Sequence, residues 1–304
     1  MSNIGYTVAS NQLLVPAFTS PTIDGSGTGS GASVTSVAAT LSTTKTNDII
    51  VAVIFIATSG TTVSSVAGGS LTWTLFSSTP NGIFIYWAFA SGTLTSVSIT
   101  ATLSTTGTAG IIVFGVNGAN TTYPFDPILS PAQYSASNGN ATSLSYSVTT
   151  YLTNELLIGI LATATAGITF TVGSGFTSIA TVTTNVSMLI EYTTLTTTNT
   201  TTPVSATVNS STQLYLSTTA IQSSPMFFVQ PPSGQEWIIH NIFYGSPCQI
   251  SFGSTTSNSF VNIYDITSGF GILPGLLIHV SNTNYLIIQP IVEGNFGYNG
   301  VRTV

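Results

Sequence analysis

Residues 46–54 read TNDIIVAVI, and residues 153–161 read TNELLIGIL. In both stretches a Thr-Asn-acid sequence passes directly into a run of aliphatic residues. A short apolar run of this kind, bounded by turn residues, is typical of a buried β-strand. We therefore predict two equivalent buried strands. The acid that opens each one, Asp48 or Glu155, is expected to be a turn or edge residue that accepts backbone N–H bonds.

The similarity between the two stretches extends along the chain. An alternating Ser/Thr segment precedes each of them, at 34–41 and 144–150. The segments that follow match in order, with an offset that stays between 103 and 108 residues. Self-similarity at a fixed offset indicates a duplication. The matched pairs are 61–73 with 168–176, 84–87 with 188–192, 96–101 with 204–208, and 111–114 with 214–217.

The duplication predicts the domain organisation. We expect an N-terminal arm at 1–20, a first β-sandwich at 21–128, a second at 129–224, and a smaller β-sandwich at 225–304. Each repeat should supply about six short strands bounded by Gly, Asn and Ser turns, as in antiparallel sandwiches and jelly rolls. The predicted fold class is all-β, with tandem jelly-roll or β-sandwich domains. The connection at 120–127 contains two prolines and Asp126, and it is expected to be a structured link between repeats.

Charge is nearly missing from the chain. Lys, Arg, Asp and Glu together make up 3% of the 304 residues, against about 25% in an ordinary domain. With two cations in total, the chain cannot neutralise a row of phosphates, so nucleic-acid binding is excluded. Few carboxylates are available for pairing in the native state, and such pairs are the usual weak point in acid. We therefore expect acid stability and service in an acidic medium. Simple Thr/Ser enrichment of a surface protein remains the alternative.

No catalytic constellation is evident, so we predict that the chain is not an enzyme and holds no cofactor. The glycine-rich stretch 25–31 lacks the lysine of a phosphate-binding loop and is interpreted as a flexible linker. Glu236, His240 and His279 could form a metal site if folded together, but a structural role is preferred and no metal is predicted. Cys248 is the single cysteine, and it is expected to be a buried, inert thiol.

Two further groups of residues are candidates for surface roles. Trp73, Trp87 and Trp237 are either core and rim aromatics, which is the preferred interpretation, or platforms for a ligand or an interface. Five Asn-x-Ser/Thr sequences are candidate glycosylation sites if the protein is exposed, although several would arise by chance in so Thr- and Asn-rich a chain. They are Asn120, Asn140, Asn185, Asn199 and Asn209.

Three resemblances add to this interpretation. The segments 46–53, 63–74, 86–88 and 118–126 resemble a β-sandwich module of phage and bacterial surface proteins. The stretch 231–242, PPSGQEWIIHNI, resembles the opening of small C-terminal domains in structural proteins of archaeal viruses. A chain of sandwiches is also similar in architecture to the turret and penton-base proteins of archaeal icosahedral viruses. These resemblances imply a role as a structural protein of a virus particle.

The leading hypothesis is a vertex turret, penton or spike component that is exposed on the virion and contributes to assembly and host attachment. Its expected partners are copies of itself in a ring at a symmetry axis, other capsid proteins, and host surface glycans. No signal-like segment opens the chain and no apolar run is long enough to span a bilayer. We thus expect assembly in the host cytoplasm. The alternatives are a carbohydrate-binding adhesin or tail fibre, in which Trp73, Trp87, Tyr86 or Trp237 would stack on sugars, and a cellular surface filament.

Overall fold

The computed structural model shows a chain built almost entirely of antiparallel β-strands. It describes residues 12–14, 20–121, 124–126, 129, 132–150, 155–196, 200–223, 227–229, 236–244, 248–254, 260–266, 271–273, 278–280, 284–290 and 296–302. For most residues after 223 the description is confined to the backbone. None of these residues lies in an α-helix, so no helix there is long and apolar enough to cross a membrane. The chain divides into two compact units, 19–223 and 1–18 together with 224–304.

The first repeat forms a six-stranded sheet with the order β2-β7-β3-β6-β5, in which β4 also pairs with β7. The strands β2 and β7 are far longer than the short strands expected, because each bends and contributes to two layers. The bounds are β2 (Thr22–Leu41), β3 (Asp48–Ile56), β4 (Val63–Ala67), β5 (Thr74–Ser78), β6 (Ile83–Ala90) and β7 (Val97–Asn117).

The second repeat forms another six-stranded sheet with the same topology, β8-β13-β9-β12-β11, in which β10 also pairs with β13. Each strand therefore has a counterpart six places earlier in the chain, and the sequence repeat corresponds to a repeat of topology. The bounds are β8 (Gln133–Thr150), β9 (Glu155–Thr163), β10 (Phe170–Thr171), β11 (Thr177–Val182), β12 (Ser187–Leu195) and β13 (Thr200–Ile221).

Strands β3 and β9 are buried along their whole length. Successive side chains of a strand point to opposite faces, so each of these strands contributes to two cores. From β3, Ile49, Val51, Val53 and Phe55 enter a core shared with the second repeat, whereas the alternate residues enter a core within the first repeat. The prediction that these stretches are buried strands is confirmed, and the reason is that each separates two apolar layers.

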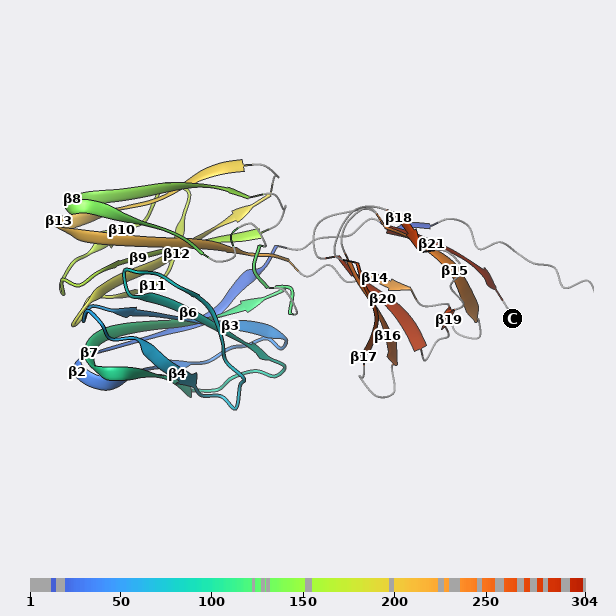
Figure 1. Ribbon diagram of the computed structural model, residues 1–304, viewed down its shortest axis with the longest axis horizontal. Coiled ribbons are helices and arrows are strands. Elements are labelled where there is room, and N and C mark those ends of the chain that lie inside the picture. Colours follow the sequence, from blue (N-terminus) through green and yellow to red (C-terminus); the bar gives the residue numbers. More distant parts are fainter. Residues whose placement is uncertain are drawn as a thin grey trace, which may run out of the picture. The chain divides into compact units, whose positions relative to one another are not determined.

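The core shared by the repeats makes 19–223 one unit. Its members from the second repeat include Leu156, Ile158 and Ile160 of β9 and Met188 and Ile190 of β12. The sequence predicted two sandwiches at 21–128 and 129–224; in the structure the two halves pack sheet against sheet. Figure 1 shows the strands of the two halves as two stacked groups, blue to teal and green to yellow.

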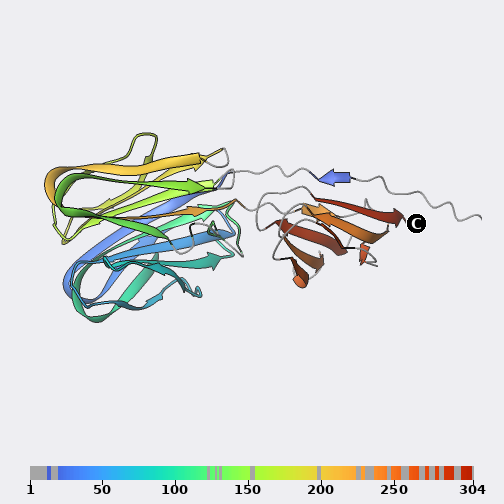
Figure 2. The same ribbon diagram turned by 45° about the horizontal axis from the view of Figure 1, so that its top comes forward.

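Each repeat also folds over itself. In the first repeat, residues 97–102 of β7 pair with 36–41 of β2, and residues 109–116 of β7 pair with β3. The two parts of the sheet enclose the first repeat's own core, to which Leu41, Ile54 and Ile99 belong. In the second repeat, β13 likewise pairs through its first part with the end of β8 and through its last part with β9. Figure 2 shows the long strands curving at one end of each sheet.

The glycine-rich stretch 25–31 is not a linker but part of β2. Gly27 and Gly29 lie directly over the returning half of the same strand. A Cβ at Gly27 would lie 1.9 Å from the carbonyl oxygen of Thr40, and one at Gly29 would lie 1.8 Å from that of Ala38. Because glycine alone lacks a Cβ, its alternation along this strand allows the two layers to meet backbone to backbone. The interpretation as a flexible linker was wrong because it did not consider that glycine recurs at every second position of 25–31, which places these glycines on one face of the strand.

In the described part of the connection between the repeats, 120–121 and 124–126, backbone hydrogen bonds join it to the end of β13 and the residue that follows, which agrees with the predicted structured link. The backbone N–H of Asp126 donates to the carbonyl of Ala220 over 2.9 Å, and that of Gln222 donates to Pro124 over 2.9 Å. Phe125 is buried and stacks on Phe76, with ring centroids 3.6 Å apart. The connection therefore closes one side of the shared core.

The unit of 1–18 and 224–304 contains two further antiparallel sheets. One has the order β1-β21-β15-β18, with β19 also pairing with β15, and the other has the order β14-β20-β16-β17. Residues 12–14, expected to belong to a separate arm, form a strand paired with β21. The bounds are β1 (Gln12–Leu14), β14 (Phe227–Val229), β15 (Trp237–Tyr244), β16 (Cys248–Ser254), β17 (Phe260–Ile266), β18 (Gly271–Leu273), β19 (Ile278–Val280), β20 (Asn284–Pro290) and β21 (Phe296–Arg302).

The close approach within β2 gives a direct test of the folded-over strand. We expect Gly29→Ala to lower the free energy of unfolding by about 3 kcal/mol or more, because backbone rather than a flexible side chain must move. Gly92→Ala is the control, since no atom lies within 4 Å of its Cβ position, and it should change stability by less than about 0.5 kcal/mol. Urea unfolding measures both; equal stability of the two variants would contradict the packing described.

Candidate functional site

The ionisable side chains of 19–223 are distributed in an unusual way. All five carboxylic acids of this unit are at most 8% exposed, and four of them are 0% exposed. Its one cation, Lys45, is exposed. Acids are among the residues that are least often buried, whereas here the interior holds all of them and the surface carries hydroxyl and amide groups. The buried acids are Asp24, Asp48, Asp126, Glu155 and Glu191.

Asp24 and Asp48 form a pair at one end of the first repeat. Asp24, on β2, accepts hydrogen bonds from the backbone N–H of Thr44 at 2.8 Å, from its hydroxyl at 2.7 Å, and from the N–H of Lys45 at 2.7 Å. Asp48, the first residue of β3, accepts a 2.8 Å bond from the side-chain amide of Asn117 at the end of β7. The loop between β2 and β3 thus fixes the carboxyl of Asp24, and Asn117 at the end of β7 fixes that of Asp48.

The two carboxyls have opposite acidities. Burial raises the pKa of Asp24, but the hydrogen bonds from Thr44 and Lys45 outweigh this effect and hold the pKa below its ordinary value. Burial also raises the pKa of Asp48, to about 6; the Asn117 bond opposes this shift, and the hydrogen bond and charge of Asp24 add to it. Asp24 is thus ionised and Asp48 protonated over the weakly acidic range.

Glu191 lies in the middle of β12 and faces the core of the second repeat. Its Oε2 accepts a 2.8 Å hydrogen bond from the backbone N–H of Gly173, and its Oε1 has no hydrogen-bond partner. It lies opposite Gly159 of β9, where an added Cβ would be 3.1 Å from Oε1. Burial raises the pKa of Glu191 to about 7, against the lowering effect of the Gly173 bond.

These carboxyls are proton-binding groups enclosed by the fold. Asp48 and Glu191 are both 0% exposed, so they act on the pH dependence of stability rather than on a ligand. The sequence identified Asp48 and Glu155 through the repeat, and both begin a buried strand as predicted. The expected turn or edge role was wrong for Asp48, which is fully buried on a central strand and accepts its hydrogen bond from the side chain of Asn117. The sequence did not identify Asp24 or Glu191. The available signal for Glu191 was an acid within the apolar stretch 188–192.

The aromatic residues proposed as ligand platforms pack against the cores. Trp73 is half-buried against the first repeat's core, and its ring N–H donates to the carbonyl of Gly68 over 3.2 Å. Trp87 is half-buried against the shared core and meets Phe125 edge to face, with ring centroids 6.3 Å apart. Tyr86 is buried, so it cannot stack on a sugar. The side chain of Trp237 lies outside the described residues.

The five candidate glycosylation sites differ in accessibility. Asn120 is 1% exposed, which leaves no space for a glycan, so this prediction was wrong for the folded protein. Asn140 and Asn209 are exposed, and the Oδ1 of Asn209 accepts a 2.9 Å bond from the N–H of Thr169. Asn185 is half-buried and donates to the hydroxyl of Ser30 over 3.1 Å. Asn199 lies outside the described residues.

The remaining candidates cannot be placed as a site. The side chains of Cys248, His240 and His279 lie outside the described residues. Glu236 is described and half-buried. Across the part of the chain that the structure describes, no group of three or more His, Cys, Asp or Glu side chains is arranged to hold a metal ion.

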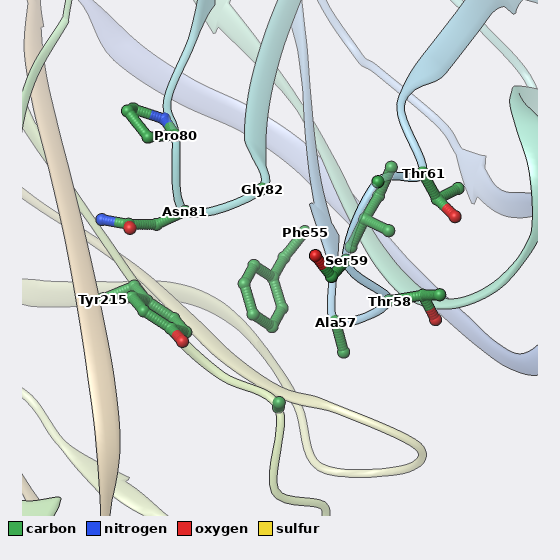
Figure 3. Close-up of a pocket in the computed structure, with 12 residues that line it drawn as sticks. Phe55, Ala57, Thr58, Ser59, Thr61, Pro80, Asn81, Gly82 and Tyr215 are labelled. Atoms are coloured by element: carbon green, nitrogen blue, oxygen red, sulfur yellow. The ribbon is translucent and has the colours of Figure 1, made fainter. Parts of the chain in front are cut away.

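A pocket lies where the two repeats meet, and no pattern in the sequence indicates it. We call it the Tyr215 pocket; it encloses about 220 Å³ and is lined by 55–61, 80–82, Ala164 and Tyr215. The rings of Phe55 and Tyr215 lie with their centroids 5.7 Å apart and inclined by 41°. Figure 3 shows the Phe55 ring between Tyr215 on one side and the loop with Thr58 and Ser59 on the other.

Comparison with known proteins identifies no relative: no family model, no curated protein and no solved structure matches this chain.

The raised pKa of Glu191 predicts how stability depends on pH. The folded state keeps this carboxyl protonated up to about pH 7, whereas the unfolded chain ionises it near 4.5. The protonated carboxyl therefore contributes roughly 3 kcal/mol to the free energy of unfolding below pH 4.5, and this contribution is lost as the pH rises to about 7. We expect Glu191→Gln to match the wild type in acid and to exceed its stability above pH 7, as measured by urea unfolding across this range.

Asp48 and Asp24 provide the matched comparisons. Asp48→Asn should likewise remove a fall in the free energy of unfolding as the pH rises from 3.8 to about 6. Asp24→Asn should do the opposite and destabilise at neutral pH, since a lowered pKa stabilises the fold above 3.8 and loses its effect only in stronger acid. A Glu191→Gln variant with an unchanged pH slope would show that the carboxyl is not protonated in the folded state.

Proposed function

We propose that the chain is a structural protein of a virus particle, carried on the virion surface as a vertex turret, penton or spike component. One observation carries the proposal: 19–223 places all five of its acids inside and a single cation outside. An exterior of this kind changes little in charge as the pH changes. The interior acids with raised pKa values favour the folded state at low pH. This combination suits a particle that must survive an acidic exterior.

The uncharged surface also supports assembly. Burying hydroxyls and amides against a partner that hydrogen-bonds them costs less than burying ions, which must be desolvated and paired. We propose that the chain associates with copies of itself in a ring at a symmetry axis and with other capsid proteins. The tandem sandwiches, in which a jelly-roll arrangement is proposed for each repeat, would supply rigid walls for such contacts.

The proposal is tested by imaging purified virus particles from the source culture by electron cryo-microscopy, with mass spectrometry to locate the chain. We expect the chain among the particle proteins, and density that fits the 19–223 unit in rings at the vertices. Sedimentation of the purified chain should show a ring-sized oligomer in acid. A chain that is monomeric and absent from particles would contradict the proposal, and recovery from cell surfaces instead would favour a filament or adhesin.

A further inference from the structure

We propose that the Tyr215 pocket binds one ring of a neutral saccharide. Its volume of about 220 Å³ is below the roughly 300–1,000 Å³ of sites for drug-sized ligands, so a single small ring fits. The proposal goes beyond a structural role in a particle, since sugar binding by the purified chain does not require assembly.

The lining defines the charge of the ligand. None of the residues that line the pocket is Asp, Glu, Lys, Arg or His. An ionic ligand would lose its hydration without gaining a countercharge, which is unfavourable in a partly enclosed site. The pocket therefore selects an uncharged molecule.

The lining also defines the polarity of the ligand. Tyr215 is half-buried and offers its ring to the pocket, whereas Phe55 is 1% exposed and packs against that ring from the shared core. Figure 3 shows Thr58 and Ser59 across the Phe55 ring from Tyr215, and Asn81 on the same side of that ring as Tyr215. A purely apolar ligand would leave these polar groups unpaired. A pyranose has an apolar face that can stack on the Tyr215 ring, and it has hydroxyls that can hydrogen-bond the polar side chains of the lining.

Backbone and side-chain bonds hold the walls of the pocket in place. Pro80 and Asn81 are the central residues of a turn closed by the N–H of Gly82 donating to Thr79 over 3.2 Å. The hydroxyl of Thr58 accepts a 2.9 Å bond from the N–H of Thr108, which leaves its own proton for a ligand. The Asn81 side chain has no hydrogen bond to the described residues, so its amide can serve a ligand. A pre-formed site loses little conformational entropy on binding.

The duplication shows that the pocket is specific to one end of the shared core. By the pairing registers of the two repeats, Ala162 corresponds to Phe55 and Gly110 corresponds to Tyr215, because Tyr215 pairs with Ala162 and Gly110 pairs with Phe55. Both Ala162 and Gly110 are buried. The equivalent position in the other half therefore lacks both aromatic rings.

The test titrates the full-length chain with methyl glycosides of glucose, galactose and mannose and follows the amide resonances by NMR. We expect at least one glycoside to shift the resonances of Gly60, Asn81 and Gly82, and glucuronate and glucosamine to leave them unchanged. Tyr215→Ile and Asn81→Ala should each weaken binding by about tenfold or more. Phe89→Ala removes an exposed aromatic residue outside the pocket lining, and it should leave affinity unchanged.

Three results would overturn the proposal: no glycoside shifts these resonances, a charged sugar binds equally well, or Tyr215→Ile and Asn81→Ala bind like the wild type. Unfolding curves of the variants distinguish lost binding from lost folding, and Asn81→Ala, in a half-buried turn position, keeps the test valid if Tyr215→Ile is unstable. Failure here would leave the particle role unaffected, because that role is decided by imaging.

Discussion

The burial of β3 and β9 on both faces is the constraint on which the rest of 19–223 depends. A strand of this kind is stable only if an apolar layer covers each side. One side is covered by the strand's own repeat folding over it, and the other by the sheet of the opposite repeat. The result is a stack of β-layers, with one core shared by the two repeats and further cores within each repeat. Removing any layer would expose a continuous aliphatic face, so we expect the two repeats to unfold together.

The same constraint explains where the charges lie. The opening acid of each doubly buried strand, Asp48 or Glu155, is carried into the interior because the strand begins there. A buried carboxyl without a cation is held by hydrogen bonds or by a proton. Asn117 and Asp24 provide this at Asp48, and Gly173 and a raised pKa provide it at Glu191. Burial of Asp48 and Glu191 therefore lowers the free energy of unfolding at high pH rather than at low pH.

Much of the fold could be predicted from the chain because the relevant signals are local. The Thr-Asn-acid openings and the offset between repeats identified the strands and their order in each half. The packing of one repeat on the other could not be predicted, since an aliphatic run shows that a strand is buried but not which sheet covers it. The glycines at 25–31 were misinterpreted because their spacing has meaning only against the strand's own return. The Tyr215 pocket joins residues from 55 to 215, and no sequence pattern connects them.

A pH titration of the side-chain carboxyl carbons by NMR, with assignments from Asn and Gln variants, determines whether protonated carboxyls lie inside the almost uncharged exterior of 19–223. We predict that Asp48 titrates near pH 6 and Glu191 near pH 7, with Asp24 below its ordinary value. If Asp48 and Glu191 both titrated at the ordinary values of 3.8 and 4.5, these groups would be in contact with solvent, and the account of the interior would be contradicted.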